Sequence, residues 1–395
     1  MKRKIAIIIE RADITLGGAE RSVFELASAL SARGLQVHIL AAKGRTKAKN
    51  IHILCRTKPG RRTRHFTFAK AIKKHLAENL YDIVHSVLPF DFADVYQPRG
   101  GSFAEAILRN ACSYRSRFIQ SYKKATAFAN FRRATLLRAE KKLCNNPDGP
   151  TIAALSKYVA DQFRQRYKLD DSRIVVIPNG VRVDERIDTA VAGKLRTQIL
   201  AKLSLKEMDS PIFFLFAANN FRLKGLAVLI KAMHLAAARY RASKAYLIVA
   251  GRDRARTYRH LAKKLKVDTR IVFLGKVRHI QNALSITDVA AIPTFYDPSS
   301  RFTLEALAAN KPVITTRFNG ATDLFSDNTH GKVIASPRDI PQLAAAIAHF
   351  TNPENIQKAA AAIAADNLRE KISIKRTAQL TEALYESIIE KRRQR

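Results

Sequence analysis

Short apolar, β-branched runs alternate along this chain with amphipathic helical segments, and the alternation occurs twice. The first round opens with an apolar run at 5–9, a helical segment with Val23, Leu26 and Leu30 on one face, and a second apolar run at 37–41. Strand, helix and strand in this order form the βαβ unit of a parallel sheet, because parallel strands need a crossover connection. The pattern therefore predicts α/β architecture with buried strands.

The second round follows a polar stretch that begins at Pro178-Asn179-Gly180 and predicts no strand up to about Asp209. A chain of 395 residues is too long for one ordinary core, so we place a domain boundary there. The segments expected after it are strands at 212–217, 246–250, 271–274 and 289–292 and helices at 225–240, 257–265 and 280–285. We predict two doubly wound, Rossmann-like α/β domains facing across a cleft, at 1–180 and 181–370, followed by a helical segment at 371–395.

Positive charge dominates the composition, with 70 Lys and Arg against 33 Asp and Glu and a formal net charge of +37. Residues 26–77 contain no acid, and a second basic stretch runs from Arg109 to Lys142, so the excess lies mainly in the first half. This distribution indicates an anionic partner: nucleic acid, an anionic membrane face or a phosphorylated acceptor. A generally basic, solvated surface is the alternative.

The segment 103–143 has apolar residues near helical period with many cations between them. We expect one helix or two, whose apolar stripe either packs in the core or lies on a bilayer surface. No apolar run in the sequence reaches the roughly 20 residues that span a membrane. Cys55, Cys112 and Cys144 have no metal-site spacing, so we expect reduced thiols, a cytoplasmic protein and no structural zinc.

The stretch 293–323 reads as a strand end, a polar turn, a helix, a short strand and a glycine turn. Asp297 falls in the turn and Glu305 in the helix. The helix N-terminus would open at the carboxyl end of a strand, where free N–H groups suit a phosphate and a carboxylate can accept from sugar hydroxyls. The alternative is a capped helix with two solvated acids.

Two further motifs occupy comparable positions. Gly17-Gly18 at a helix start lets the backbone approach a ligand closely, although glycine pairs mostly form turns. Arg222 and Lys224 lie between a buried strand and a helix, where two cations can bind a diphosphate and stabilise a departing phosphate. A solvated Arg and Lys are the plainer interpretation. Asn319-Gly320, with Asp323 beside it, is a turn next to the 297–305 stretch.

Taken in order, these motifs resemble glycosyltransferase family 4, whose members are nucleotide-sugar-dependent retaining enzymes of the GT-B fold. The resemblance covers nearly the whole chain through GGAER at 17–21, DIVH at 82–85, SKYVADQF at 156–163, VIPNGV at 176–181, FRLKG at 221–225, LIVAG at 247–251 and the acid-x7-Glu stretch that runs into LEALAANKPVITTRFNGATDL. FRLKG and the polar SSRFTLEAL are most similar to the lipopolysaccharide core sugar transferases.

The resemblance implies a role for each matching residue. Arg222 and Lys224 would hold the donor diphosphate, and Glu305 would hold the nucleotide ribose. Asp297 and the backbone of Ser300, Arg301, Phe302 and Thr303 would hold the transferred sugar and phosphate. Gly17 and Gly18 would contact the donor from the first domain, which binds the acceptor, and the C-terminal helix would pack back on that domain. UDP is the nucleotide expected from family frequency.

The chain departs from the family pattern in two places. Asp297 replaces the usual first Glu and shortens its reach toward the sugar by one methylene. Ser299 and Ser300 replace the usual glycine-containing loop, so the loop geometry is expected to differ.

The mechanism implied by the resemblance is front-face displacement, with Arg222 and Lys224 stabilising the diphosphate as it leaves. His85 and Asp94, at first-domain strand ends, are alternative groups that assist proton transfer, although a lone His there is more often structural. No D-x-D motif is present in the sequence, and cationic side chains can do the charge work, so no metal is expected.

The basic first half then suggests peripheral attachment to the inner face of the cytoplasmic membrane and an anionic glycolipid or glycan acceptor. A nucleic-acid-binding protein is the main rival, but the sequence contains none of the usual reading motifs. A nucleotide-sugar epimerase or a phosphorylase of the same fold is a second rival, and a family member without activity is a third.

Overall fold

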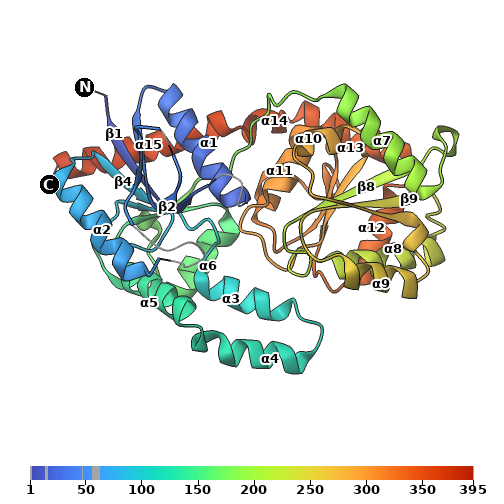
Figure 1. Ribbon diagram of the computed structural model, residues 1–395, viewed down its shortest axis with the longest axis horizontal. Helices are drawn as coiled ribbons and strands as arrows, with labels where there is room; N and C mark the ends of the chain where they lie inside the picture. The colour runs from blue at the N-terminus through green and yellow to red at the C-terminus, as the bar shows by residue number, and fades with distance from the viewer. Residues whose placement is uncertain (1, 14–16, 47, 56–62, 395) are drawn as a thin grey trace. The chain divides into compact units, whose positions relative to one another are not determined.

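The protein forms two compact units in a computed structural model that describes residues 2–13, 17–46, 48–55 and 63–394 (Figure 1). The first unit comprises Met1–Ala111, Arg115–Gly180 and Ile374–Arg395. The second comprises Cys112–Tyr114 and Val181–Ser373. Parts of the first basic stretch, at 47 and 56–62, lie outside the described residues.

The first unit is built on a seven-stranded sheet with the order β3-β2-β1-β4-β5-β6-β7, in which the described strand pairs are parallel. Its strands are β1 (Lys4–Ala12), β2 (Gln36–Gly44), β3 (Ile51–Ile53), β4 (Ile83–Ser86), β5 (Val95–Tyr96), β6 (Thr151–Ala154) and β7 (Ile174–Val176). Its helices are α1 (Gly18–Ala32), α2 (His65–Glu78), α3 (Phe103–Cys112), α4 (Arg117–Ala125), α5 (Phe131–Asn145), α6 (Lys157–Tyr167) and α15 (Ile374–Arg393).

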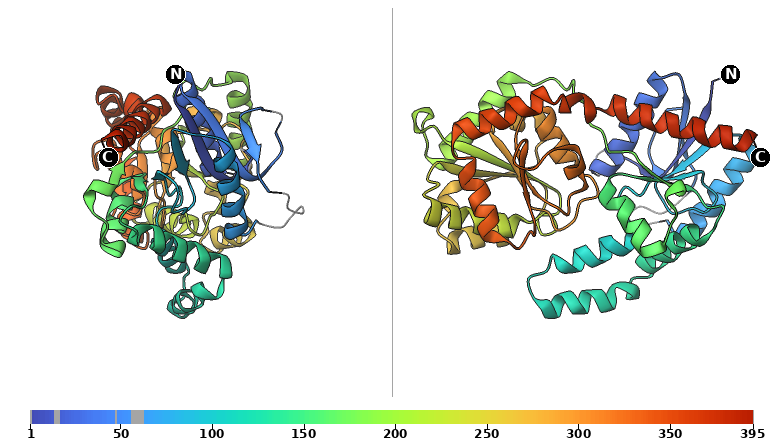
Figure 2. Two further views of the ribbon diagram at one scale, coloured as in Figure 1. Left: turned by 90° about the vertical axis from the view of Figure 1, so that its left-hand side faces the viewer. Right: turned by 180° about the vertical axis from the view of Figure 1, so that it is seen from behind.

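Strand β1 is buried on both faces, which explains its nearly continuous apolar sequence. Ile5 and Ile7 belong to a cluster that includes α1 and α15, whereas Ala6 and Ile8 belong to a cluster that includes α2. Successive strand residues point to opposite faces, so helices cover both sides of this sheet. Helix α15, at the C-terminus, packs against α1 (Figure 2).

The second unit is built on a six-stranded sheet with the order β10-β9-β8-β11-β12-β13, again with parallel pairs. Its strands are β8 (Ile212–Ala217), β9 (Ala245–Ala250), β10 (Ile271–Gly275), β11 (Val289–Ile292), β12 (Val313–Thr316) and β13 (Gly331–Ile334). Its helices are α7 (Thr189–Leu203), α8 (Leu226–Tyr240), α9 (Arg256–Lys264), α10 (Ile280–Ser285), α11 (Arg301–Ala308), α12 (Ile340–His349), α13 (Pro353–Ala365) and α14 (Leu368–Lys371).

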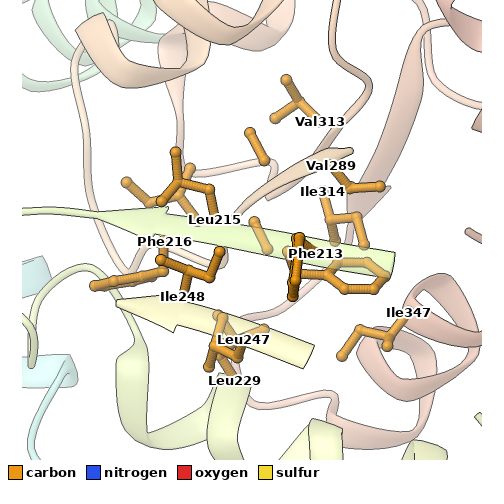
Figure 3. Packing of buried hydrophobic residues seen from close by; sticks show 14 of the residues in the cluster. Phe213, Leu215, Phe216, Leu229, Leu247, Ile248, Val289, Val313, Ile314 and Ile347 are labelled. Atoms are coloured by element: carbon orange, nitrogen blue, oxygen red, sulfur yellow. The ribbon is translucent and has the colours of Figure 1, made fainter. Parts of the chain in front are cut away.

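The core of the second unit is dominated by strand β8, whose IFFLF run is buried (Figure 3). Phe213, Leu215 and Phe216 pack with residues of β9, β11 and β12, and Leu229 of α8 and Ile347 of α12 belong to the same cluster. Both sheets are therefore parallel and covered by helices, which confirms the predicted pair of doubly wound α/β domains.

One predicted segment is wrong in detail. The segment 103–143 forms neither one helix nor two but α3, α4 and α5, with a 3-10 turn at Thr126–Ala129. Ser116 and Asn130 each accept a hydrogen bond from a backbone N–H three residues on, so each starts a new helix. The polar stretch before Asp209 contains no strand, as predicted, and it also contains α7, which was not predicted and whose Ile199 and Leu203 are buried in the second core.

Within the described residues, no helix combines the length and the apolar character needed to cross a bilayer.

Candidate functional site

The candidate site of the second unit is built where β8 and β11 end side by side. Strand β8 lies between β9 and β11 in the sheet order. From β8 the chain continues toward one edge of the sheet through β9 and β10, and from β11 it continues toward the other edge through β12 and β13. In open α/β sheets ligands bind outside the carboxyl ends of the strands at this position. The loop after β8 carries Arg222 and Lys224, and the loop after β11 carries Asp297 and leads into α11.

Gly225 lets the two loops approach closely. Its φ is +84°, and a Cβ atom at this position would lie 2.0 Å from the carbonyl oxygen of Pro293. Only glycine fits such a contact in that backbone conformation. The backbone N–H of Phe295 donates to the carbonyl of Leu223 at 2.8 Å, which joins the loops directly.

Lys224 and Asp297 form an ion pair across these loops. Lys224 Nζ donates to Asp297 Oδ2 at 2.5 Å and to the carbonyl oxygen of Tyr296 at 3.0 Å. The side chains are 19% and 14% exposed, so the pair is largely screened from water yet open on one side. The family resemblance predicted that both residues contact the donor, and the structure places them next to each other.

Helix α11 begins at the same place. Ser300 is its N-cap and its hydroxyl accepts from the backbone N–H of Thr303. Glu305, 6% exposed, accepts from Nε of Arg301 at 2.8 Å within one helical turn. The predicted ribose carboxylate is thus buried and already paired with a cation of its own helix.

Asn319 organises this region, although the sequence analysis treated it only as part of a turn. Its Oδ1 accepts from the backbone N–H groups of Ser300 and Ala321, both at 3.1 Å. Its Nδ2 donates to the hydroxyls of Thr303 and Thr315 at 2.9 and 3.0 Å. Asn319 is fully buried and therefore fixes the start of α11 against the end of β12. The Asn-Gly pair was the only signal of it in the sequence.

Arg222 contacts the short Cys112–Tyr114 segment that belongs to the second unit. Its guanidinium donates to the hydroxyl of Ser113 and lies 3.8 Å from the ring centroid of Tyr114. Nη2 of Arg338 donates to the carbonyls of Cys112 and Tyr114 at 2.8 and 2.7 Å. These contacts join residues more than 100 positions apart, so sequence patterns gave no sign of them.

The first-domain candidates belong to the first unit. Gly17 precedes α1 with an extended backbone and supplies no side-chain cap to the helix that begins at Gly18. His85 is 1% exposed, and its Nδ1 lies 2.7 Å from the hydroxyl of Tyr385 on α15. Burial, and next the charge of Arg99, lower the pKa of His85 to about 3. The ring is therefore neutral at pH 7 and a weak base.

Asp94 already has partners for both carboxylate oxygens. Oδ2 accepts from the backbone N–H of Val84 at 2.7 Å, and Oδ1 accepts from Arg392 of α15. Burial raises the pKa of this carboxyl group. These contacts tie Asp94 to β4 and to the C-terminal helix.

The second-unit site offers a specific set of functional groups. Lys224 provides a cation, Asp297 and Glu305 provide acceptors, and α11 begins beside them with Ser300 as its N-cap. A helix N-terminus and cations suit phosphate oxygens, and carboxylates suit sugar hydroxyls.

Two family models match the sequence. The model described as "Glycosyltransferase Family 4" matches residues 16–185, and the model described as "Glycosyl transferases group 1" matches residues 200–367. One match covers most of the first unit and the other most of the second.

Similar proteins include a curated relative from Escherichia coli K12, the lipopolysaccharide glucosyltransferase WaaG. It is 25% identical over 333 residues, which cover 83% of this chain and 84% of WaaG. The crystal structure of WaaG superposes with a TM-score of 0.71 at 20% identity, over 97% of this chain and 99% of that one. Anabaena Alr3699/HepE in complex with UDP and glucose gives a TM-score of 0.68 at 18% identity, over 97% and 99% of the two chains. These solved structures share the fold.

Proposed function

Because the chain belongs to glycosyltransferase family 4, we propose that it transfers a hexose from a UDP-sugar to a hydroxyl group of lipopolysaccharide core or a related membrane glycolipid. The observation that carries this proposal is the grouping of Lys224, Asp297 and Glu305 at the ends of β8 and β11, beside the N-terminus of α11. The similarity to WaaG supports the acceptor class, and the UDP complex of the Anabaena protein supports the nucleotide.

In this proposal each group of the site has a task. Lys224 and Arg222 bind the diphosphate, together with the backbone N–H groups at the start of α11. Glu305 accepts from the ribose hydroxyls, and Arg301 holds that carboxylate in place. Asp297 accepts from a hydroxyl of the transferred sugar through the oxygen that Lys224 leaves available. Gly17 and Gly18, in the first unit, let the donor approach the backbone there.

The reaction we propose retains the configuration of the sugar. The bond between the anomeric carbon and the diphosphate breaks, and the acceptor oxygen bonds to that carbon from the same face. The acceptor proton passes to the departing phosphate oxygen. Lys224 and Arg222 stabilise the negative charge that grows on the diphosphate, and such preorganised charge is usually the largest catalytic term. These two cations supply the charge that a metal ion supplies elsewhere, so we propose that no metal is needed.

His85 and Asp94 enter this scheme as acceptor-side candidates. With a pKa of about 3, His85 is better suited to accepting or donating a hydrogen bond than to removing a proton. Asp94 is held by Arg392 and the Val84 N–H, and His85 is buried against Tyr385, so the two stay alternative candidates.

Binding of UDP, measured by calorimetry, tests the donor site. The wild-type protein should bind UDP in the micromolar range, and Glu305→Ala should weaken binding by about 1.5–3 kcal/mol, the usual contribution of a hydrogen bond to a charged group. Glu354→Ala, an exposed change in the first turn of α13, is the matched control and should leave the affinity unchanged. No binding, or equal binding by all three proteins, would remove the donor site from consideration.

We further propose that the first unit attaches peripherally to the inner face of the cytoplasmic membrane. Helix α4 has no buried residue, and Phe118 and Tyr122, four positions apart, are 81% and 56% exposed. Arg117, Lys123 and Lys124 lie on the same helix. Exposed aromatic residues among cations suit the interface of an anionic bilayer, where each Lys or Arg contributes about 1 kcal/mol. Helix α4 lies away from the first sheet in all three views (Figures 1 and 2).

Vesicle co-sedimentation tests this attachment. The protein should bind vesicles with an anionic lipid at low salt, and binding should decrease with salt because the charges are screened. Phe118→Ser with Tyr122→Ser should weaken binding, whereas Leu80→Ser, which changes an 87% exposed leucine elsewhere in the first unit, should not. Binding that ignores lipid charge, or equal loss in both variants, would contradict the attachment.

A further inference from the structure

A small cavity lies at the corresponding position of the first unit, and the proposed donor site makes no use of it. Strand β1 lies between β2 and β4, so the strands that follow it in sequence are added toward opposite edges of the sheet on its two sides, as they are beside β8. The pairing of β1 with β4 ends at Ile8 and Ser86, and Glu10 follows on the carboxyl side. Glu10 lines the cavity together with Thr63, His65 and Arg132, and Leu88 and Leu136 form apolar walls. Its volume of about 10 Å³ is room for roughly one water molecule.

The polar groups of this cavity are of both kinds, acceptor and donor. Nη2 of Arg132, on α5, donates to Oε2 of Glu10 at 2.5 Å. The two side chains are 32% and 23% exposed, so the pair is partly open. Nε2 of His65 is buried and has no hydrogen-bond partner among the residues that the structure describes. A buried polar atom of this kind normally has a hydrogen-bond partner, so Nε2 is suited to bind a polar group that enters the cavity.

The orientation and the charge state of His65 are defined by its surroundings. The imidazole stacks on Phe90 with the ring centroids 4.5 Å apart. Burial lowers the pKa of His65, and the charge of Arg132 acts in the same direction, so the ring is neutral at pH 7. The other ring nitrogen hydrogen-bonds to the backbone of Pro89, which offers only a carbonyl group, so Nδ1 carries the proton and Nε2 is an acceptor.

We infer that this cavity receives one hydroxyl group of the saccharide acceptor, held by His65 Nε2, Glu10 and Arg132. The inference rests on the proposed function and adds an acceptor-binding site to it. The cavity has the size of a hydroxyl group, and a hydroxyl can accept from the Arg132 guanidinium while it donates its one proton to His65 Nε2 or to the Glu10 carboxylate. A phosphate fits poorly, because it is larger than the cavity and would meet the Glu10 carboxylate.

Two disruptive cavity variants, one conservative variant and one matched control separate acceptor binding from folding and from charge. His65→Phe keeps an aromatic ring against Phe90 and removes the nitrogen, and His65→Gln restores a polar group at a similar reach. Arg132→Met removes the cation of the cavity, and Arg133→Met removes the same charge from the neighbouring, exposed position of α5. Any general effect of charge on membrane or acceptor binding should be equal in the last two variants.

The assay measures transfer from UDP-glucose to lipopolysaccharide purified from an E. coli strain that lacks WaaG, with UDP binding and thermal unfolding recorded in parallel. We expect His65→Phe and Arg132→Met to raise the KM for this acceptor about tenfold or more. UDP affinity should not change, His65→Gln should recover part of the loss, and Arg133→Met should match the wild type. The same shifts should appear with dephosphorylated lipopolysaccharide, since the cavity takes a hydroxyl.

Three results would overturn the inference. One is an unchanged acceptor KM in both His65→Phe and Arg132→Met, which would mean that the cavity holds only a water molecule. Another is an equal effect of Arg133→Met. The third is a wild-type protein that binds UDP but transfers nothing to this acceptor. Failure of the wild type to bind UDP is distinct, because it refutes the proposed function, and this inference with it.

Discussion

Replacement of Asn319 by alanine is the perturbation whose cost the structure defines best. The side chain is fully buried and makes two hydrogen bonds through Oδ1 and two through Nδ2. Alanine leaves the backbone N–H groups of Ser300 and Ala321 without this acceptor, and both residues are at most 2% exposed. A buried donor that loses its partner costs about 1–3 kcal/mol, so the two together cost about 2–6 kcal/mol of unfolding free energy.

Urea unfolding followed by circular dichroism measures this loss, because the chain has no tryptophan for fluorescence. Hydrogen exchange then shows whether the weakened amides lie at the start of α11. The control is Asn352→Ala, which removes an exposed helix cap of α13 in the same unit and should cost about 1 kcal/mol. A loss for Asn319→Ala no larger than that of the control would refute the role of Asn319 as the residue that fixes these loops.

Three further predictions concern charge, pH and backbone. Lys224→Met should weaken UDP binding by about 1.5–3 kcal/mol, roughly 10- to 150-fold. Asp297→Asn removes a negative charge from the proposed diphosphate site, so this variant should bind UDP at least as tightly while transfer falls; equal losses of affinity in both variants, measured by calorimetry, would contradict this. Burial lowers the pKa values of His38, His52 and His75, which lie together in the first unit. The unfolded state therefore binds more protons, and the free energy of unfolding should fall as the pH decreases below about 6.5. Unfolding measured between pH 7.5 and 5 tests this, and His52→Gln should flatten the pH dependence. Gly225→Ala should destabilise the second unit by about 3 kcal/mol or more in urea, because its Cβ would lie 2.0 Å from the Pro293 carbonyl oxygen and its φ is +84°; a loss below 1 kcal/mol, roughly the cost of an ordinary surface change, would show that the loops can separate.

Local patterns in the sequence were sufficient to predict the longer buried strands and their order along the chain. The apolar run 289–292 is β11, and the helix predicted at 280–285 is α10. Strand β5, by contrast, has two residues, too few for a periodic pattern, and it exists because β4 and β6 pair with it on either side. Helix α7 was not predicted because polar residues are interspersed with its apolar ones, and its buried face is defined only by packing in the second core.

The candidate site divides in the same way. Arg222, Lys224 and Asp297 could be placed at strand ends from sequence, since a strand followed by a turn and a helix predicts that position. The contact between Lys224 and Asp297 joins residues 73 positions apart and depends on β8 lying beside β11, which no local pattern encodes. The pairing of Glu10 with Arg132 likewise depends on the tertiary fold, as the two residues are 122 positions apart.

The most direct test of the account is transfer of glucose from UDP-glucose to lipopolysaccharide of an E. coli strain without WaaG, with the new linkage assigned by nuclear magnetic resonance. UDP-glucose carries an α-linked glucosyl group, so the retaining reaction predicts an α-linked product that forms without added metal and is lost with Lys224→Met. A β-linked product would contradict front-face displacement, and a requirement for a divalent metal would contradict the charge role of Lys224 and Arg222. Binding of UDP without transfer of glucose to this acceptor would contradict the proposed reaction itself.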